Sequence, residues 1–312
     1  MPSKLNNLFK IAVTGIMIFI LGSLVAKYRD ELTHLKNISP AQFALITILI
    51  VGSIIINGMK LRSLAGSFKI KLTGRETLGL SSITTSLNNF FFKAGSLFTS
   101  NYLKKRYEFP FMSFAGSQGA DVLISFFINA FIGLAISVFY LLTKKGVFIT
   151  LALGYLSIVI VLGLIFSKTF DLQHRPNKYL NALIRAINSL YRILKNKKLF
   201  FTLCLFNILI VTLNTLRFFL VCKVLGVDIP IGYCLLFISL LPFISTLPFF
   251  QSDIGTRELI LGVFSQWLGA GFEAGMLATL LDRCFIVFTA VIISLFFQNL
   301  MTGINLKSAM ED

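Results

Sequence analysis

Long apolar runs separated by short basic segments dominate the chain. The runs lie at about 11–26, 41–61, 113–142, 146–166, 199–222 and 273–299. A helix that crosses the hydrocarbon layer of a bilayer needs about 20 predominantly apolar residues, and these runs are of that order. The pattern therefore predicts an all-α membrane protein, a polytopic helical bundle with six full spans.

The first run has two interpretations. It follows Lys4 and Lys10 and ends near Ala26, so it has the form of a signal peptide, with residues 23–26 as a cleavage site. Because many further spans follow, we favour an uncleaved first transmembrane helix.

The more polar run 78–103 decides the topology. If it crossed the membrane once, the basic clusters at 62–75 and 104–106 would lie on opposite sides, against the positive-inside rule. We therefore predict that it enters and leaves on the cytoplasmic side as a re-entrant helical hairpin. Its turn would contain Asn88, Asn89 and Gly95, since irregular backbone at that depth needs a polar cavity or protein around it.

The run 231–268 has the same form. Pro242 interrupts its first half, and the turn would contain Pro248, Asp253 and Gly255 before a second helix begins. This hairpin would enter from the outside. Both termini are then cytoplasmic in a multi-pass protein of the cytoplasmic (inner) membrane.

The basic segment 176–198 is amphipathic. An apolar stripe that includes Leu183, Ile187 and Leu194 opposes a polar stripe that includes Arg185 and Arg192 at helical spacing. One interpretation is a cytoplasmic interfacial helix on an anionic lipid surface. The other is a basic connector that only fixes orientation.

The order span, hairpin, span occurs twice. The interval along the chain from Gly95 to Asp121 is nearly the same as the interval from Gly255 to Asp282. The two copies, about 9–142 and 146–299, have opposite orientations, and inverted repeats of this kind are typical of transporters with a substrate site at the repeat interface. We predict a single integral membrane domain over 1–312.

Composition excludes other classes. The chain has 29 Lys and Arg against 13 Asp and Glu, but only 13% of its residues are charged, against about 25% in soluble domains. Its basic residues lie between apolar runs, which argues against nucleic-acid binding. The four cysteines lie in apolar runs without metal-ligand spacing, so we expect buried thiols and no metal or cofactor.

Charged residues inside the apolar runs are the candidate functional residues, because a charge in a membrane needs a partner or an aqueous cavity. Four basic residues lie deep enough to qualify: Lys93, Arg217, Arg257 and Arg283. The predicted substrate-binding set is Lys93, Asp121, Arg257, Glu258, Asp282 and Arg283. The other interpretation is a buried ion-pair network that fastens hairpin to span.

Two of these positions carry a more specific expectation. Arg257 and Glu258 begin the second half-helix, whose unpaired N–H groups favour a lipid phosphate. Asp282 and Arg283 are adjacent in a helix and point about 100° apart, so they need not pair with each other.

Several of these residues stand in recognisable motifs. Residues 247–258, LPFFQSDIGTRE, resemble the Pro-x4-Gly-x-Gly-x-Arg-Glu motif of the lysylphosphatidylglycerol synthase transmembrane-region family of flippase-like membrane proteins. Asp282-Arg283 resembles its Asp-Arg in the following span. Asn88-Asn89 with residues 93–95 resembles its first motif, Asn-Asn-x-x-Pro-x-Arg-Ala-Gly-Glu.

The chain departs from those motifs at three positions. Phe91 stands where the first motif has proline, Ser96 where it has glutamate, and Asp253 where the second motif has its first glycine. The missing glutamate puts a role for an acid in the first hairpin in doubt.

The resemblance implies that a phospholipid or a polyprenyl-linked lipid moves between leaflets, bound through its headgroup phosphate. The chain ends at Asp312, soon after its last span, and it has no catalytic motif, so we expect no synthase domain and no enzyme activity. The alternative is a non-catalytic membrane subunit that supports a glycosyltransferase or lipid-modifying enzyme in envelope assembly, docked through 176–198.

Overall fold

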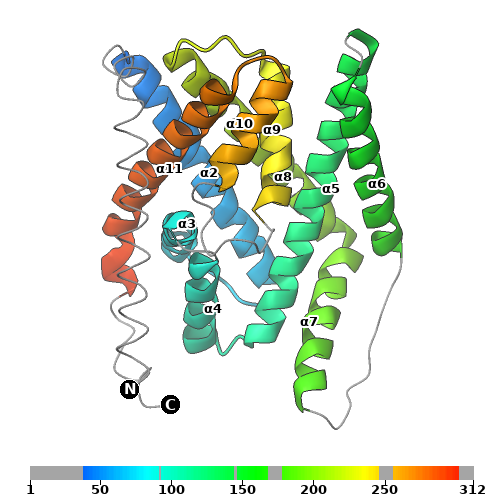
Figure 1. Ribbon diagram of the computed structural model, residues 1–312. Helices are drawn as coiled ribbons and strands as arrows, with labels where there is room; N and C mark the ends of the chain where they lie inside the picture. Colours follow the sequence, from blue (N-terminus) through cyan, green and yellow to red (C-terminus); the bar gives the residue numbers. More distant parts are fainter. Residues whose placement is uncertain (1–37, 91–92, 144–145, 168–177, 246–255, 302–312) are drawn as a thin grey trace, which may run out of the picture.

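The structure is a computed structural model that describes residues 38–90, 93–143, 146–167, 178–245 and 256–301. These residues form ten helices and no strand (Figure 1). Five helices are long and apolar enough to cross a membrane, and they coincide with five of the six predicted spans: Pro40–Ser67, Phe111–Leu142, Phe148–Ser167, Lys197–Val224 and Phe272–Phe297. The sixth predicted span, 11–26, lies outside the described residues.

The described helices are of two kinds, five long and five short, and the short ones include two consecutive pairs that each lie between long helices. The long ones are α2 (Pro40–Ser67), α5 (Phe111–Thr143), α6 (Val147–Ser167), α8 (Lys197–Val224) and α11 (Phe272–Met301). The short ones are α3 (Gly74–Phe90), α4 (Ala94–Tyr107), α7 (Lys178–Lys195), α9 (Ile231–Ile244) and α10 (Thr256–Trp267). In Figure 1, α4 lies in the lower half of the bundle, and α9 and α10 lie in the upper half.

Two long helices begin with side-chain caps. Ser39 and Gln42 form a capping box at the start of α2, with Pro40 in the first turn. The Asn196 side chain accepts a hydrogen bond from the Leu199 N–H at 3.1 Å and starts α8 directly after α7. These caps satisfy backbone N–H groups that would otherwise be left unpaired.

The main hydrophobic core joins α2, α8, α9, α10 and α11. At its centre, the buried Phe237 ring lies 5.8 Å from that of Phe218 and 5.5 Å from that of Phe264, both edge-on. This geometry is the one that aromatic pairs prefer, and it fixes α9 between α8 and α10.

The outward faces of the bundle are apolar as well. Leu142 on α5 is 83% exposed and Phe296 on α11 is 80% exposed, and α6 presents Leu153, Ile160 and Leu164 to the outside. Water-soluble monomers rarely expose apolar surface on this scale. The surroundings that suit these faces are lipid tails.

The run 78–103 is divided between two helices, α3 and α4, that pack as a hairpin. Thr84 and Thr99 hydroxyls lie 2.6 Å apart, and the Tyr102 and Tyr107 hydroxyls donate to the Glu76 carboxylate at 2.7 and 2.9 Å. Burial acts to raise the pKa of Glu76, but the hydrogen bonds from these tyrosines and from Thr73 outweigh it and lower the pKa to about 2. Glu76 therefore stays ionised at neutral pH and holds the foot of the hairpin closed.

Helix α7 occupies most of the predicted basic segment 176–198 and lies beside the lower part of α5 (Figure 1). Ile184 of its apolar stripe is buried, as is Ile193. Arg185, Arg192 and Lys195 on the opposite stripe are exposed. Leu183 of the predicted apolar stripe is 56% exposed, so only part of this stripe packs against the bundle, while the opposite stripe leaves basic groups exposed.

Gly116 on α5 permits the close crossing with α7. A Cβ at this position would overlap the carbonyl oxygen of Ala186, a backbone atom of α7, whereas a Cβ at Gly119 would meet only Leu190 Cδ1 at 3.5 Å. We predict that Gly116→Ala lowers the apparent Tm of the purified protein, because overpacking costs about 1–3 kcal/mol.

Gly119→Ala is the matched control on the same helix. We expect its Tm to stay unchanged or rise slightly, because alanine is the better helix former by about 1 kcal/mol. Equal Tm values for the two variants in thermal unfolding would contradict the close crossing.

Candidate functional site

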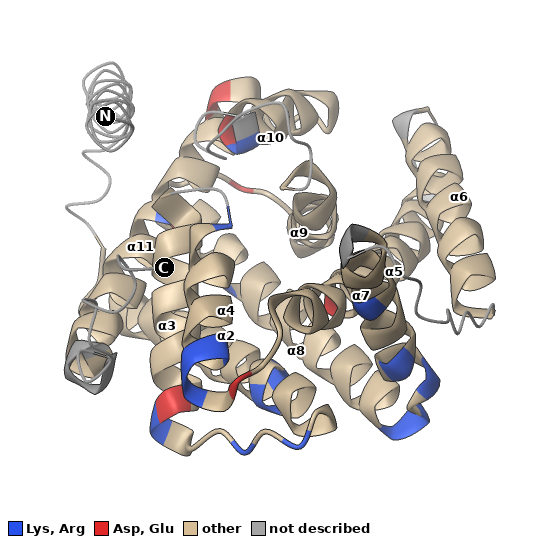
Figure 2. Cartoon of the chain, turned by 90° about the horizontal axis from the view of Figure 1, so that it is seen from below, with Lys and Arg blue, Asp and Glu red and all other residues tan. Residues whose placement is uncertain are grey.

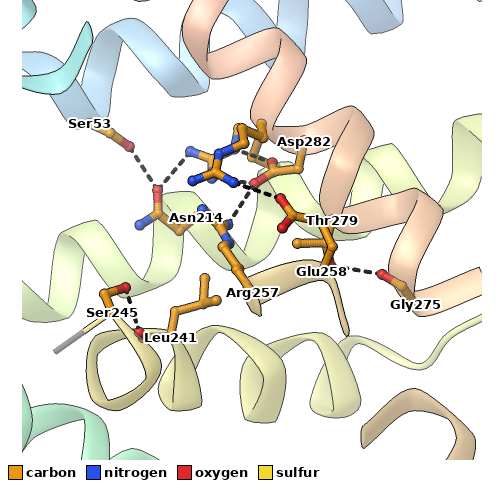
Figure 3. Close-up of polar contacts among 11 residues, drawn as sticks. Ser53, Asn214, Leu241, Ser245, Arg257, Glu258, Gly275, Thr279 and Asp282 are labelled. Carbon is orange, nitrogen blue, oxygen red and sulfur yellow. Dashed lines mark hydrogen bonds and ion pairs between the residues drawn. The ribbon is translucent and has the colours of Figure 1, made fainter. Parts of the chain in front are cut away.

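The most buried ion pair in the described residues joins α8 to α11. Arg217 Nε lies 2.6 Å from Asp282 Oδ1, and Arg217 Nη2 lies 3.0 Å from Asp282 Oδ2, a two-pronged geometry. Asp282 is 0% exposed and Arg217 is 4% exposed. Asn214 accepts a further hydrogen bond from Arg217 at 2.8 Å and one from Ser53 at 3.2 Å (Figure 3).

Helix α10 places two more charged residues, Arg257 and Glu258, beside this ion pair. Arg257 Nη2 lies 3.3 Å from Asp282 Oδ2, and the buried Glu258 accepts from Arg283 Nη1 at 2.8 Å. Asp282 and Arg283 therefore turn to different partners, as their helical spacing predicted. We call Arg217, Arg257, Glu258, Asp282 and Arg283 the α11 charge cluster; it fastens α10 and α8 to α11.

A second ion pair joins α2 to α5. Lys60 Nζ lies 2.9 Å from Asp121 Oδ2, and it also donates to Asn207 Oδ1 on α8 at 3.0 Å. The predicted set of deep basic residues, Lys93, Arg217, Arg257 and Arg283, was incomplete, since Lys60 is buried as well. Lys60 was missed because it stands at the end of an apolar run, whereas Asn207, an amide within a span, was a signal of interhelical hydrogen bonding.

The two ion pairs stand at matching positions of their helices. Lys60 is as far along α2 from its first residue, Pro40, as Arg217 is along α8 from its first residue, Lys197. Asp121 and Asp282 likewise stand at equal intervals from the first residues of α5 and α11. The helix lengths also correspond, at 28, 17, 14 and 33 residues for α2 to α5 and 28, 14, 12 and 30 for α8 to α11.

The Lys60–Asp121 pair borders a polar cavity of about 220 Å³ between α2, α3, α4 and α5. The residues that line it are Asn57, Lys60, Leu61, Leu64, Ser81, Thr84, Thr85, Asn88, Ser96, Thr99, Phe114, Gln118 and Asp121. A polar cavity of this kind is what makes broken helices tolerable at membrane depth.

The turn of the first hairpin is tightly built. The Gly95 N–H donates to Asn88 Oδ1 at 2.9 Å, and a Cβ at Gly95 would overlap the backbone of Thr84. Lys93 precedes α4 with a φ of 55°; it is exposed and is not among the residues that line the polar cavity.

An apolar groove of about 510 Å³ lies at the end of α3, along α11. Its lining consists of Asn89, Phe90, Leu280, Arg283, Cys284, Val287, Phe288, Val291 and Ile292. Asn88 lines the polar cavity and its neighbour Asn89 lines the apolar groove, so the tip of the hairpin separates the two spaces.

Other predicted site features have mixed outcomes. Pro248, Asp253 and Gly255 lie outside the described residues. The expectation of four buried thiols was wrong for Cys284, which is exposed, and Cys204 is only partly buried. In the described part of the chain, no group of three His, Cys, Asp or Glu side chains could hold a metal ion.

The chain matches one family model over nearly its whole length. Residues 7–294 match the family described as the lysylphosphatidylglycerol synthase TM region. The chain belongs to this family. No curated protein and no solved structure matches it.

The structure shows where residues of the two family motifs lie. Within this lysylphosphatidylglycerol synthase TM region, Ser96 stands where the first motif has glutamate, and Ser96 lines the polar cavity. Arg257 and Glu258 of the second motif belong to the α11 charge cluster.

Substitutions that break the Arg217–Asp282 ion pair test how much this pair stabilises the fold. Removing one partner of a buried pair costs about 3–5 kcal/mol, because the other charge stays buried without compensation. We predict that Asp282→Asn and Arg217→Met each lower the Tm strongly, and that the double variant regains part of the loss. Double-mutant thermal unfolding measures this.

Lys223→Gln is the control, because it removes the exposed Lys223–Asp228 pair near the end of the same helix. Solvent screens such an exposed pair, so its removal should leave the Tm nearly unchanged. A double variant no more stable than the worse single variant would contradict the pairing of Arg217 with Asp282.

Proposed function

We propose that this protein moves a lipid between the two leaflets of a membrane, without chemical conversion of the lipid. The observation that carries the proposal is the tip of the first hairpin, with the polar cavity on one side and the apolar groove on the other. A lipid likewise has a polar part, its headgroup, and an apolar part, its acyl chains. Its headgroup would pass through the cavity while its acyl chains stay in the groove and the surrounding lipid.

The arrangement of the helices supports an inverted repeat. Matching ion pairs link α2 to α5 and α8 to α11, and each pair flanks a pair of short helices. In transporters with inverted repeats, broken helices from the two halves meet near the midplane, at the substrate site. We propose that α3–α4 and α9–α10 are two such re-entrant hairpins.

The charge distribution supports a cytoplasmic orientation for the end of the molecule in Figure 2. Lys and Arg residues gather there over α4, α7 and the connection between α2 and α3. Positive residues of short loops stay in the cytoplasm. The exposed Arg185, Arg192 and Lys195 of α7 would then contact the anionic headgroups of the cytoplasmic leaflet.

Filling the polar cavity tests the proposal. Gln118 on α5 lines the cavity, so Gln118→Phe would replace an amide by apolar bulk in the path of the headgroup. In liposomes with fluorescent phospholipids and polyprenyl-linked lipids, we predict that the wild-type protein exchanges lipid between leaflets. Gln118→Phe should slow that exchange about tenfold or more, equivalent to about 1.4 kcal/mol in the barrier.

Val138→Phe is the control, since it adds the same side chain to the same helix at an exposed position. Its exchange rate should equal that of the wild type. Absence of exchange for every lipid would reject the translocase and favour the accessory membrane subunit, with the basic face of α7 as its docking surface.

A further inference from the structure

The polar cavity is lined by neutral hydrogen-bonding groups far more than by charges. Of its thirteen lining residues, three are apolar and two are charged. The remaining eight carry a hydroxyl or an amide: Asn57, Ser81, Thr84, Thr85, Asn88, Ser96, Thr99 and Gln118. Hydroxyls and amides both donate and accept hydrogen bonds, so they match groups that do the same.

The two charges in the lining are already compensated. Lys60 Nζ lies 2.9 Å from the Asp121 carboxylate and 3.0 Å from Asn207 Oδ1, while Asn207 Nδ2 lies 3.4 Å from Asp121 Oδ1. A phosphate or an ammonium group that entered the cavity would find no unpaired counter-charge in the lining unless it separated this pair. Burying a charge without a partner is costly, so the cavity discriminates against charged headgroups.

The groups suited to a phosphate lie elsewhere. Arg217, Arg257 and Arg283 belong to the α11 charge cluster, and in the described part of the chain none of them lines the polar cavity. Ser96, at the position where the related motif has glutamate, brings a hydroxyl to the cavity in place of an acid. The lining is therefore uncharged on the α3 and α4 side.

We infer that the polar cavity receives an uncharged, hydroxyl-rich headgroup, a sugar or another polyol carried on a lipid. The inference rests on the proposed function and names its substrate class. The volume fits, because about 220 Å³ equals roughly seven water molecules at about 30 Å³ each, the room for a single sugar or polyol unit. The headgroup's hydroxyls can donate to and accept from the hydroxyl and amide groups of the lining, at no cost in buried charge.

Liposome exchange with three lipids of identical labelled chains tests the inference. The probes are monoglucosyl-diacylglycerol, phosphatidylethanolamine and phosphatidylserine. We expect the glucosyl lipid to exchange about tenfold faster than the other two, a difference of about 1.4 kcal/mol in the barrier. If either charged lipid exchanges faster than the glucosyl lipid, the inference is overturned while the proposed function stands; if no lipid exchanges, both fall.

Ser96→Glu places a negative charge in the cavity and should reverse the order, slowing the glucosyl lipid and accelerating phosphatidylethanolamine. Asn101→Glu adds the same charge to an exposed position of α4 outside the lining and should leave the order unchanged. An unchanged order in Ser96→Glu, in protein with a wild-type Tm, would overturn the inference.

A soluble sugar has the same chemistry as the lipid-linked one. Uptake of labelled methyl glucoside into the same liposomes separates the two sources. We expect none, because a free sugar lacks the acyl chains that the apolar groove at the hairpin tip would receive. Uptake of the free sugar without exchange of the glucosyl lipid would overturn the assignment to a lipid.

Discussion

Two opposite charges buried between apolar helices, Arg217 and Asp282, determine how the bundle is assembled. Neither charge can lie in an apolar bundle alone, so each determines where the helix of the other must lie. Arg257 shares the same carboxylate and brings the start of α10 to this point, next to Glu258 and Arg283. The α11 charge cluster thus fixes three helices and leaves the first hairpin to form the cavity.

The ion pair between α2 and α5, the helices that flank the first hairpin, has a looser environment. Lys60 and Asp121 stand at the positions that correspond to Arg217 and Asp282, but they border an open polar space rather than a packed core. The Arg217–Asp282 pair therefore lies in a packed core, whereas the Lys60–Asp121 pair forms part of the wall of the polar cavity. In transporters with inverted repeats, alternating access moves one repeat against the other, and the two halves of this chain differ in packing as such a movement would require.

Local sequence patterns predicted the five described spans, the break in 78–103 and the helix within 176–198, because apolar period and turn residues act over a few positions. They could not predict which charges pair. Arg217 and Asp282 lie 65 residues apart, and no residue near either of them indicates the other as its partner. Lys60 was missed because it ends an apolar run, and its burial depends on Asn207 of α8. The exposed Cys284 likewise depends on the groove, which only packing reveals.

Photocrosslinking can locate the path that we propose for a lipid headgroup, between the first hairpin and α5. The photoactivatable group is placed on the headgroup of the lipid that exchanges fastest, and mass spectrometry identifies the labelled peptides. We expect labels on α3 and α4 near Thr84 and Ser96 and on α5 near Gln118. Labels confined to the lipid-facing residues of α6, such as Leu153 and Leu164, would contradict that path.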